Sequence, residues 1–211
     1  MNIRTATKED LESIAAVEAA CFPPAEAADR TAFEQRLAHY ANHFWLMFDG
    51  DKLIAFVDGF VTDTPDLTDE MYENAAMHNE NGMWQMIFGV NTLPACRKKG
   101  YAGELLQKAI YDAKKQGRKG LVLTCKKELI HYYAGFGFVN EGISQSVHGN
   151  VTWYQMSLRV PFVQKKILFG DYRVRIMLYF CSRNHEGNCI TLSFGKGNTF
   201  FSNKQIYSLK Y

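Results

Sequence analysis

One short segment, residues 90–103, constrains the fold of this chain more than any other part of the sequence. It reads as a strand that ends at Thr92, a basic turn that contains Gly100, and the start of a helix. The residues that predict a buried helix face are Leu105, Leu106, Ala109, Ile110 and Ala113. Backbone N–H groups at a helix start bind phosphate, and glycine lets an anion approach the main chain. The segment therefore predicts a pyrophosphate-binding turn.

The turn does not match two other phosphate-binding motifs. It lacks the Gly-Lys-Ser/Thr ending of the P-loop and the spaced glycines of the dinucleotide fingerprint. Basic residues before a glycine also occur in solvated loops. Taken alone, the segment leaves a phosphate site and an ordinary surface loop both open.

A second motif lies farther along the chain. The apolar run Leu121–Leu123 predicts a buried strand, and residues 129–138 predict a short helix followed by a glycine–aromatic turn. Together the two motifs resemble the GNAT superfamily of acetyl-CoA-dependent N-acetyltransferases. That family carries Arg/Gln-x-x-Gly-x-Gly/Ala at the turn and Tyr-x-x-x-Gly-Phe later. The matching residues are Arg97–Ala102 and Tyr133–Phe138.

The resemblance implies a mixed α/β fold of the GNAT type, with a central mixed sheet flanked by helices. The alternation of expected strands and helices agrees with a mixed α/β domain. Acetyl-CoA is the implied cosubstrate, and no metal is implied. The residues implied to hold the cosubstrate are Val90, Asn91, Thr92, Arg97, Lys98, Lys99, Gly100, Tyr101, Ala102 and Gly103. Tyr133 stands where the family's tyrosine protonates the sulfur of coenzyme A.

Within the family, the serotonin (arylalkylamine) N-acetyltransferase branch is the most similar. The residues that carry this narrower resemblance include Leu53–Gly59 and Cys21–Pro24. That branch has two histidines on its central strand as general bases, and the aligned positions here are Met86 and Phe88. Neither side chain accepts a proton, so the sequence leaves several candidates for the general base. The alternatives are His131, Glu26, His78 and Glu80, each acting through water.

The acceptor is expected to be the primary amine of a small molecule, acetylated directly in a ternary complex. Phe22, Pro24, Trp84 and Met86 are expected to wall its pocket, which favours an apolar or aromatic amine. Two other functions stay open. One is acetylation of proteins or peptides, and the other is a catalytically weak acyl-CoA-binding module.

The predicted elements before the central helix follow from periodicity and turn signals. They are helices at 7–20 and 31–40, a hairpin of strands 44–48 and 52–62, a polar helix at 67–79, and a central strand at 82–92. The resemblance covers residues 1–160, which we expect to form the acetyltransferase domain. Residues 161–211 form a basic C-terminal extension of unknown role.

This extension contains eight Lys and Arg residues against two Asp and Glu residues, while the whole chain carries a net charge of +2. Residues 172–176 and 190–194 alternate at strand period, which favours a β-hairpin. We favour an added hairpin, an oligomer contact or poorly ordered sequence without a selected role over nucleic-acid binding. A monomer and a homodimer are both compatible with the sequence.

The five cysteines are scattered, without Cys-x-x-Cys spacing, so neither a disulfide framework nor a zinc site is predicted. No apolar run is long enough to cross a bilayer, and the first residues lack the pattern of a secretory signal. We therefore expect a cytoplasmic protein.

Overall fold

The computed structural model describes residues 1–147, 149 and 151–160, together with the backbone of five strands between residues 162 and 208. The chain forms two compact units, Met1–Arg159 and Val160–Tyr211. The first unit holds the described helices and strands β1 to β9. Among the described residues, no helix has the length and apolar character needed to cross a membrane.

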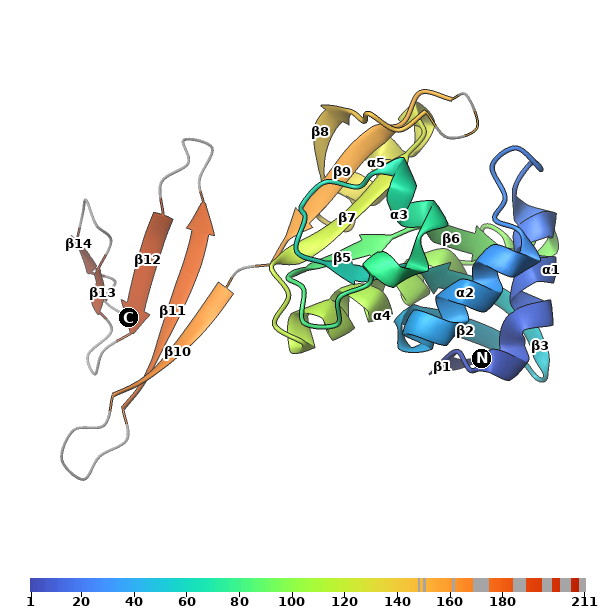
Figure 1. Ribbon diagram of the computed structural model, residues 1–211. Coiled ribbons are helices and arrows are strands. Elements are labelled where there is room, and N and C mark those ends of the chain that lie inside the picture. The colour runs from blue at the N-terminus through green and yellow to red at the C-terminus, as the bar shows by residue number, and fades with distance from the viewer. Residues whose placement is uncertain are drawn as a thin grey trace. The chain divides into compact units, whose positions relative to one another are not determined.

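Two sheets form the centre of the first unit (Figure 1). One has the order β1-β2-β3-β6, and all its neighbours are antiparallel. Its strands are β1 (Asn2–Thr5), β2 (Phe44–Asp49), β3 (Lys52–Asp58) and β6 (Gly89–Thr92). The other has the order β4-β5-β7-β9-β8, with β5 and β7 parallel. Its strands are β4 (Val61–Thr62), β5 (Trp84–Ile87), β7 (Gly120–Cys125), β9 (Tyr154–Arg159) and β8 (Val139–Ile143).

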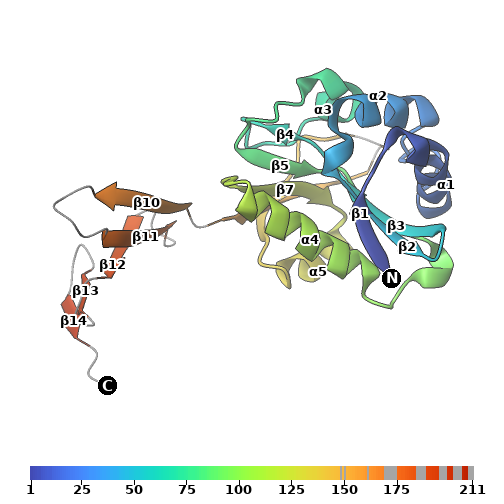
Figure 2. The same ribbon diagram turned by 90° about the horizontal axis from the view of Figure 1, so that it is seen from below.

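Helices cover the sheets on both sides. The helices are α1 (Leu11–Cys21), α2 (Arg30–Tyr40), α3 (Asp69–Glu73), α4 (Tyr101–Lys115) and α5 (Ile130–Ala134). Figure 2 shows α2 and α3 on one side of the strands and α4 on the other. This arrangement is the predicted mixed α/β fold, with a central sheet between helices.

Helix α4 follows the sequence prediction closely. Its buried residues are the five that set its apolar face, and they pack against the strands. The predicted hairpin also forms, because Asp49 pairs with Lys52 across a two-residue turn, but its second strand, expected to reach Thr62, ends at Asp58, and Val61–Thr62 form β4 in the other sheet. Gly50, the first turn residue, has a φ of +58°, as the glycine-first hairpin turn requires.

The central strand departs from the prediction of one continuous element at 82–92. It is divided at Phe88 into β5, which pairs with β7, and β6, which pairs with β3. The Phe88 N–H bonds to the Asp58 carbonyl at 2.8 Å, so the chain passes from one sheet into the other at this residue. The division matters for function because β6 and β7 are then free to diverge.

Two predicted helices are shorter than expected. The polar helix at 67–79 is reduced to α3 and the 3₁₀ turn Ala75–Met77. The helix expected from Thr7 begins with the 3₁₀ turn Lys8–Asp10, and the α-helix starts at Leu11. Asp10 explains this start, since its carboxylate accepts the Thr7 N–H and pairs with Arg4 at 2.7 Å.

The hydrophobic core lies between the first helices and the strands. It is rich in aromatic side chains that are almost completely buried: Phe33, Tyr40, Phe44, Phe56 and Phe60. Each aromatic ring buries a large apolar area, so this cluster contributes much of the stability of the unit. It fixes α2 on β2 and β3, and thereby positions Arg36, which lies between Phe33 and Tyr40 on the buried face of the same helix.

The second unit has the strand order β10-β11-β12-β13-β14. The strands are β10 (Phe162–Leu168), β11 (Arg175–Arg183), β12 (Cys189–Phe194), β13 (Thr199–Phe201) and β14 (Ile206–Ser208). The expected strand at 190–194 falls within β12, which pairs antiparallel with β11. Of the other expected strand, residues 172–174 lie outside the described residues. The role of this unit stays a prediction.

Candidate active site

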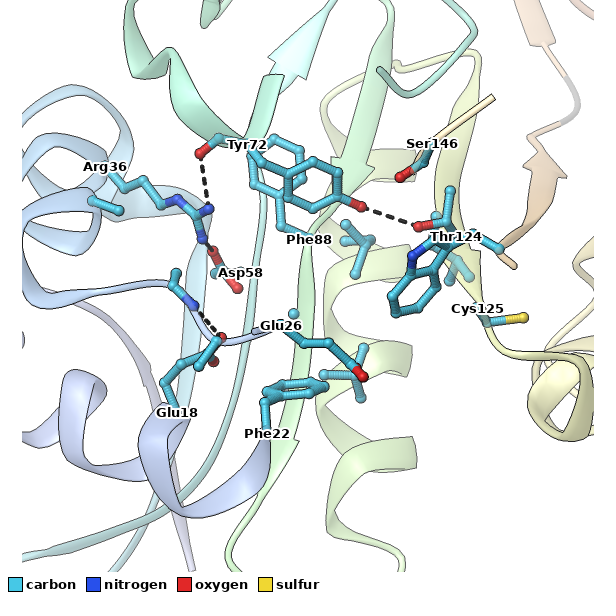
Figure 3. Close-up of a pocket in the computed structure, with 18 of the residues that line it drawn as sticks. Glu18, Phe22, Glu26, Arg36, Asp58, Tyr72, Phe88, Thr124, Cys125 and Ser146 are labelled. Atoms are coloured by element: carbon cyan, nitrogen blue, oxygen red, sulfur yellow. Dashed lines mark hydrogen bonds and ion pairs between the residues drawn. The ribbon is translucent and has the colours of Figure 1, made fainter. Parts of the chain in front are cut away.

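A cavity of about 500 Å³ opens in the first unit where β6 and β7 separate. Its walls come from α1 and the loop after it, α2, β3, α3, the strands on both sides of Phe88, β7, α5, and the segment before β9. In the close-up, Arg36 and Asp58 lie on one side of the cavity, and Thr124 and Cys125 lie on the other (Figure 3). The divided central strand thus creates a site between the two sheets.

Strand β6 presents an open edge toward this cavity. It pairs with β3 on one side, and within the described part of the chain no strand pairs with its other side. Leu93 N–H bonds to the Ile54 carbonyl, so the alternation of an antiparallel ladder turns the backbone groups of Val90 and Thr92 away from β3. The Thr92 carbonyl accepts from Arg97, at 3.2 Å. The Val90 backbone groups remain able to bond an extended ligand.

The predicted phosphate turn lies at the end of β6 and at the start of α4. Gly100 precedes the helix with a φ of +86°, and a Cβ at this position would meet no other atom within 4 Å. Lys98 also has a positive φ, of +64°, which is rare for a residue with a side chain. The first N–H groups of α4 have no acceptor within the helix. The local backbone therefore suits a phosphate.

Arg97 has a structural task in the turn. Its guanidinium donates to the carbonyls of Thr92, at 3.2 Å, and Cys21, at 3.3 Å. These contacts tie the turn to β6 and to the end of α1. Lys98 and Lys99 are exposed, while Tyr101, Ala102 and Gly103 occupy the first turn of α4. The ten predicted cosubstrate residues thus lie on β6, in the turn and in the first turn of α4, but Asn91 is buried and its backbone faces β3.

Tyr133 lies in α5 and lines the cavity from the β7 side. It is 6% exposed, and its ring contacts those of Tyr132 and Phe138. Burial raises the pKa of Tyr133, so its hydroxyl keeps its proton at neutral pH. The neighbouring Tyr132 is partly exposed, and its ring also packs against that of Phe136.

The four residues expected to wall the acceptor pocket separate into two pairs. Phe22 and Pro24 line the cavity. Trp84 and Met86 do not line it, because both side chains are buried in the core. The next residues of the chain, Ile87 and Phe88, line the cavity instead. The sequence pattern missed this because the strand division at Phe88 changes which side chains face the cavity.

Charged side chains also line the cavity, and the sequence prediction included one of them, Glu26. Arg36 pairs with Asp58 at 3.0 Å and donates to the Tyr72 carbonyl at 3.0 Å. Glu26 pairs with Lys126 at 2.9 Å. Glu18 accepts the Ala28 N–H at 3.1 Å. A charged residue on an otherwise apolar helix face is the signal that could have revealed Glu18, since it continues the buried row from Leu11 and Ile14.

The other candidate bases lie away from this cavity. His131 is exposed on α5 and is not among the lining residues. His78 and Glu80 form a separate cluster with His43, in which Glu80 contacts both histidine rings, at 2.9 and 3.3 Å. Burial would raise the pKa of Glu80, but hydrogen bonds from His43 and Asn42 and nearby positive charges lower it to about 2.

The spacing of His43, His78 and Glu80 is compatible with a metal ion, since their ligand atoms lie within 4.8 Å of one another. The hydrogen bonds argue against one. His78 Nδ1 accepts the Val61 N–H, so its Nε2 carries the proton and donates to Glu80. Arg118 also pairs with Glu80 at 2.8 Å. The cluster is therefore a hydrogen-bonded network around the Arg118–Glu80 ion pair, and it ties the chain before β5 to the end of α2.

Comparison with protein families identifies the family of this chain. The family described as "Acetyltransferase (GNAT) family" matches residues 11–138, which include the divided strand, the turn and Tyr133. The chain belongs to the GNAT acetyltransferase family. It is therefore an acyl-CoA-dependent acyltransferase, and coenzyme A is the carrier in its reaction. A search of curated proteins finds no match.

Several solved structures share the GNAT fold. The loading GNATL domain of CurA from Lyngbya majuscula is 19% identical, with a TM-score of 0.65 over 75% of this chain and 96% of that chain. The GphF GNAT-like decarboxylase, in complex with isobutyryl-CoA, is 18% identical, with a TM-score of 0.65 over 75% and 99%. The ribosomal-protein-S18-alanine N-acetyltransferase from Escherichia coli is 16% identical, with a TM-score of 0.60 over 80% and 99%. At these identities the likenesses show the fold.

Proposed function

We propose that this GNAT protein transfers an acetyl group from acetyl-CoA to the primary amine of a small molecule, directly and in a ternary complex. The observation that carries the proposal is that three features meet at one cavity. These are the open edge of β6, the hydroxyl-bearing Tyr133, and a wall of aromatic and acidic side chains. A thioester, an amine and a proton donor would meet there.

In this proposal the turn at residues 98–103 holds the diphosphate, and Val90 extends β6 by bonding the pantetheine arm as an added strand. Holding the thioester next to the amine lowers the entropic part of the barrier. Tyr133 donates a hydrogen bond to the departing sulfur and supplies its proton. The amide-forming nitrogen loses a proton in the same reaction, so the hydroxyl is restored.

The finer resemblance, to the arylalkylamine branch, also belongs to the proposal. Phe22, Phe88 and Trp153 line the cavity, which supports an amine that carries an apolar or aromatic group. The absent histidines at Met86 and Phe88 require another route for the amine proton. A cytoplasmic location and action without a metal ion complete the proposal.

A second candidate is the amino terminus of a protein. The structural likeness to a ribosomal-protein-alanine N-acetyltransferase favours testing it. Release of coenzyme A should be measured with a panel of arylalkylamines, aliphatic amines and peptides with free amino termini. Turnover with the small amines and not with peptides supports the proposal. The reverse pattern would transfer the assignment to protein acetylation, and binding of coenzyme A without any turnover would indicate a binding module.

The phosphate turn gives a prediction for cosubstrate affinity. Replacing Gly100 with Val is expected to weaken coenzyme A binding at least about tenfold, because valine disfavours a φ of +86° and the turn must change. Gly117, at the other end of α4, has a φ of +78° and equally open surroundings. Gly117→Val is therefore the matched control, with a similar loss of stability and unchanged affinity. Calorimetric titration with coenzyme A measures both. Equal affinities in the two variants would reject the phosphate site.

A further inference from the structure

The carboxylate of Glu18 is an unusual feature of the cavity wall. Glu18 lies on the inner face of α1, is 6% exposed, and lines the cavity. Its Oε1 accepts the Ala28 N–H at 3.1 Å. Its Oε2 is buried and makes no hydrogen bond of normal geometry among the described residues, while the side-chain amide of Asn91 on β6 lies close enough to lower the pKa of the carboxyl. A buried carboxylate oxygen without a partner is unfavourable, so the cavity holds an acceptor that a ligand can satisfy.

The two other carboxylates of the cavity wall that lie in ion pairs differ from Glu18. Asp58 pairs with Arg36 at 3.0 Å, and Glu26 pairs with Lys126 at 2.9 Å. No described cation lies within ion-pair distance of Glu18. In Figure 3 its dashed contact is the backbone bond alone, and it lies on the same side of the cavity as Asp58. A cationic ligand would therefore be the partner that Glu18 lacks.

The surroundings also control the protonation of Glu18. Burial is the main cause that raises its pKa to about 7, and the charge of Asp58 on β3 acts in the same direction. The Ala28 amide, Arg36 on α2 and the Asn91 amide on β6 oppose the shift. Cys21 is the other titratable neighbour on α1, and burial raises the pKa of its thiol. A group that gains and loses a proton near neutral pH is suited to general base catalysis.

We propose that Glu18 binds the acceptor as an ammonium ion through Oε2 and then accepts its proton. This inference rests on the proposed function and deepens it. It assigns the substrate class as primary amines that are protonated in solution, small enough for the cavity and apolar beyond the nitrogen. Glu18 replaces, from a different element, the base that the central strand lacks.

The proton balance is complete. The ammonium N–H bond breaks, its proton joins the Glu18 carboxylate, and the nitrogen keeps its electron pair. That pair forms the bond to the thioester carbon while the carbon–sulfur bond breaks. The second proton of the nitrogen replaces the one that Tyr133 gives to sulfur. Glu18 releases its proton to solvent before the next cycle. The net products are the amide, the free thiol and one proton.

The test compares Glu18→Gln with Glu12→Gln. Glu12 lies on the same helix, is exposed and pairs with Arg30 at 2.8 Å, so it controls for the chemical change. In the parent, kcat/KM is expected to rise with pH through about 7, because only the deprotonated carboxylate accepts a proton. Glu18→Gln should lose this rise and about 10²–10³-fold in kcat/KM at pH 7.5. Glu12→Gln should keep both.

Two further measurements do not depend on activity, and the first of them also shows whether the variant is folded. Calorimetry should give Glu18→Gln the coenzyme A affinity of the parent. Carbon-13 NMR of labelled glutamate should show one carboxyl that titrates near pH 7 in the parent and is missing in the variant. If Glu18→Gln does not fold, Glu18→Asp takes its place. It should keep a pH-dependent rise but lose rate, since its shorter carboxylate misses the amine.

The outcomes separate the two proposals. A parent that acetylates amines, with a Glu18→Gln variant that keeps the same rise and rate, would overturn the role of Glu18 and leave the acetyltransferase proposal intact. A parent that binds coenzyme A and acetylates no amine would overturn the proposed function itself. Preference for amines that are uncharged at neutral pH over cationic ones would also overturn the role of Glu18.

Discussion

Replacing Tyr133 with Phe is expected to lower kcat by about 10²–10³-fold and to leave the affinity for coenzyme A close to that of the parent. The change removes one hydroxyl and keeps the buried ring, which packs against Tyr132 and Phe138. The departing sulfur then loses its proton donor. Steady-state kinetics with an active amine and calorimetry with coenzyme A measure the two effects separately.

Tyr132→Phe is the matched control for this experiment. Tyr132 is the adjacent residue of α5, carries the same hydroxyl, and is not among the residues that line the cavity. Its variant should keep the parent kcat. If both tyrosine variants retain full activity, the sulfur receives its proton from another group and the role proposed for Tyr133 is wrong. A loss of coenzyme A affinity in Tyr133→Phe alone would indicate binding instead of proton transfer.

The second large effect concerns stability. Replacing Asp58 with Val is expected to lower the free energy of unfolding by about 3–5 kcal/mol, since it leaves the Arg36 guanidinium buried without its counter-ion. Arg36 is 5% exposed and Asp58 is 1% exposed, so little solvent screens the charge that is left. Urea denaturation gives the change in free energy directly, provided that unfolding is two-state.

Two further variants make the result specific to the ion pair. In the double variant Arg36→Met with Asp58→Val, both charges are absent, and most of the lost stability should return. Asp49→Val, at the exposed end of β2, should change stability by no more than about 0.5 kcal/mol. A double variant as unstable as Asp58→Val would mean that packing, and not the uncompensated charge, causes the loss.

The elements that sequence patterns predicted well are those fixed by local rules. Helix α4 is amphipathic, and its apolar spacing identified each of its buried residues. The hairpin of β2 and β3 was marked by Asp49-Gly50, because few residues other than glycine accept the required φ. The two GNAT motifs, in their order along the chain, were enough to indicate the family, and the family match at residues 11–138 confirms it.

The parts that sequence patterns missed depend on contacts between distant segments. Phe88 has no local signal for a strand division, which appears because β5 and β6 pair with different partners. Arg36 and Asp58 are 22 residues apart and meet only when α2 packs on β3. The unpartnered oxygen of Glu18 likewise follows from the path of the loop after α1. The sequence did not reveal that Trp84 and Met86 are buried in the core and do not line the acceptor pocket, because this burial depends on the same packing of distant segments.

The open edge of β6 has a practical consequence for the ligand-free protein. If coenzyme A covers this edge, a concentration one hundred times its dissociation constant would add about 2.7 kcal/mol to the folding free energy. Purification, storage and crystal growth would then all benefit from keeping coenzyme A present. Melting curves recorded at several coenzyme A concentrations would report how much of the site is occupied before any acceptor is known.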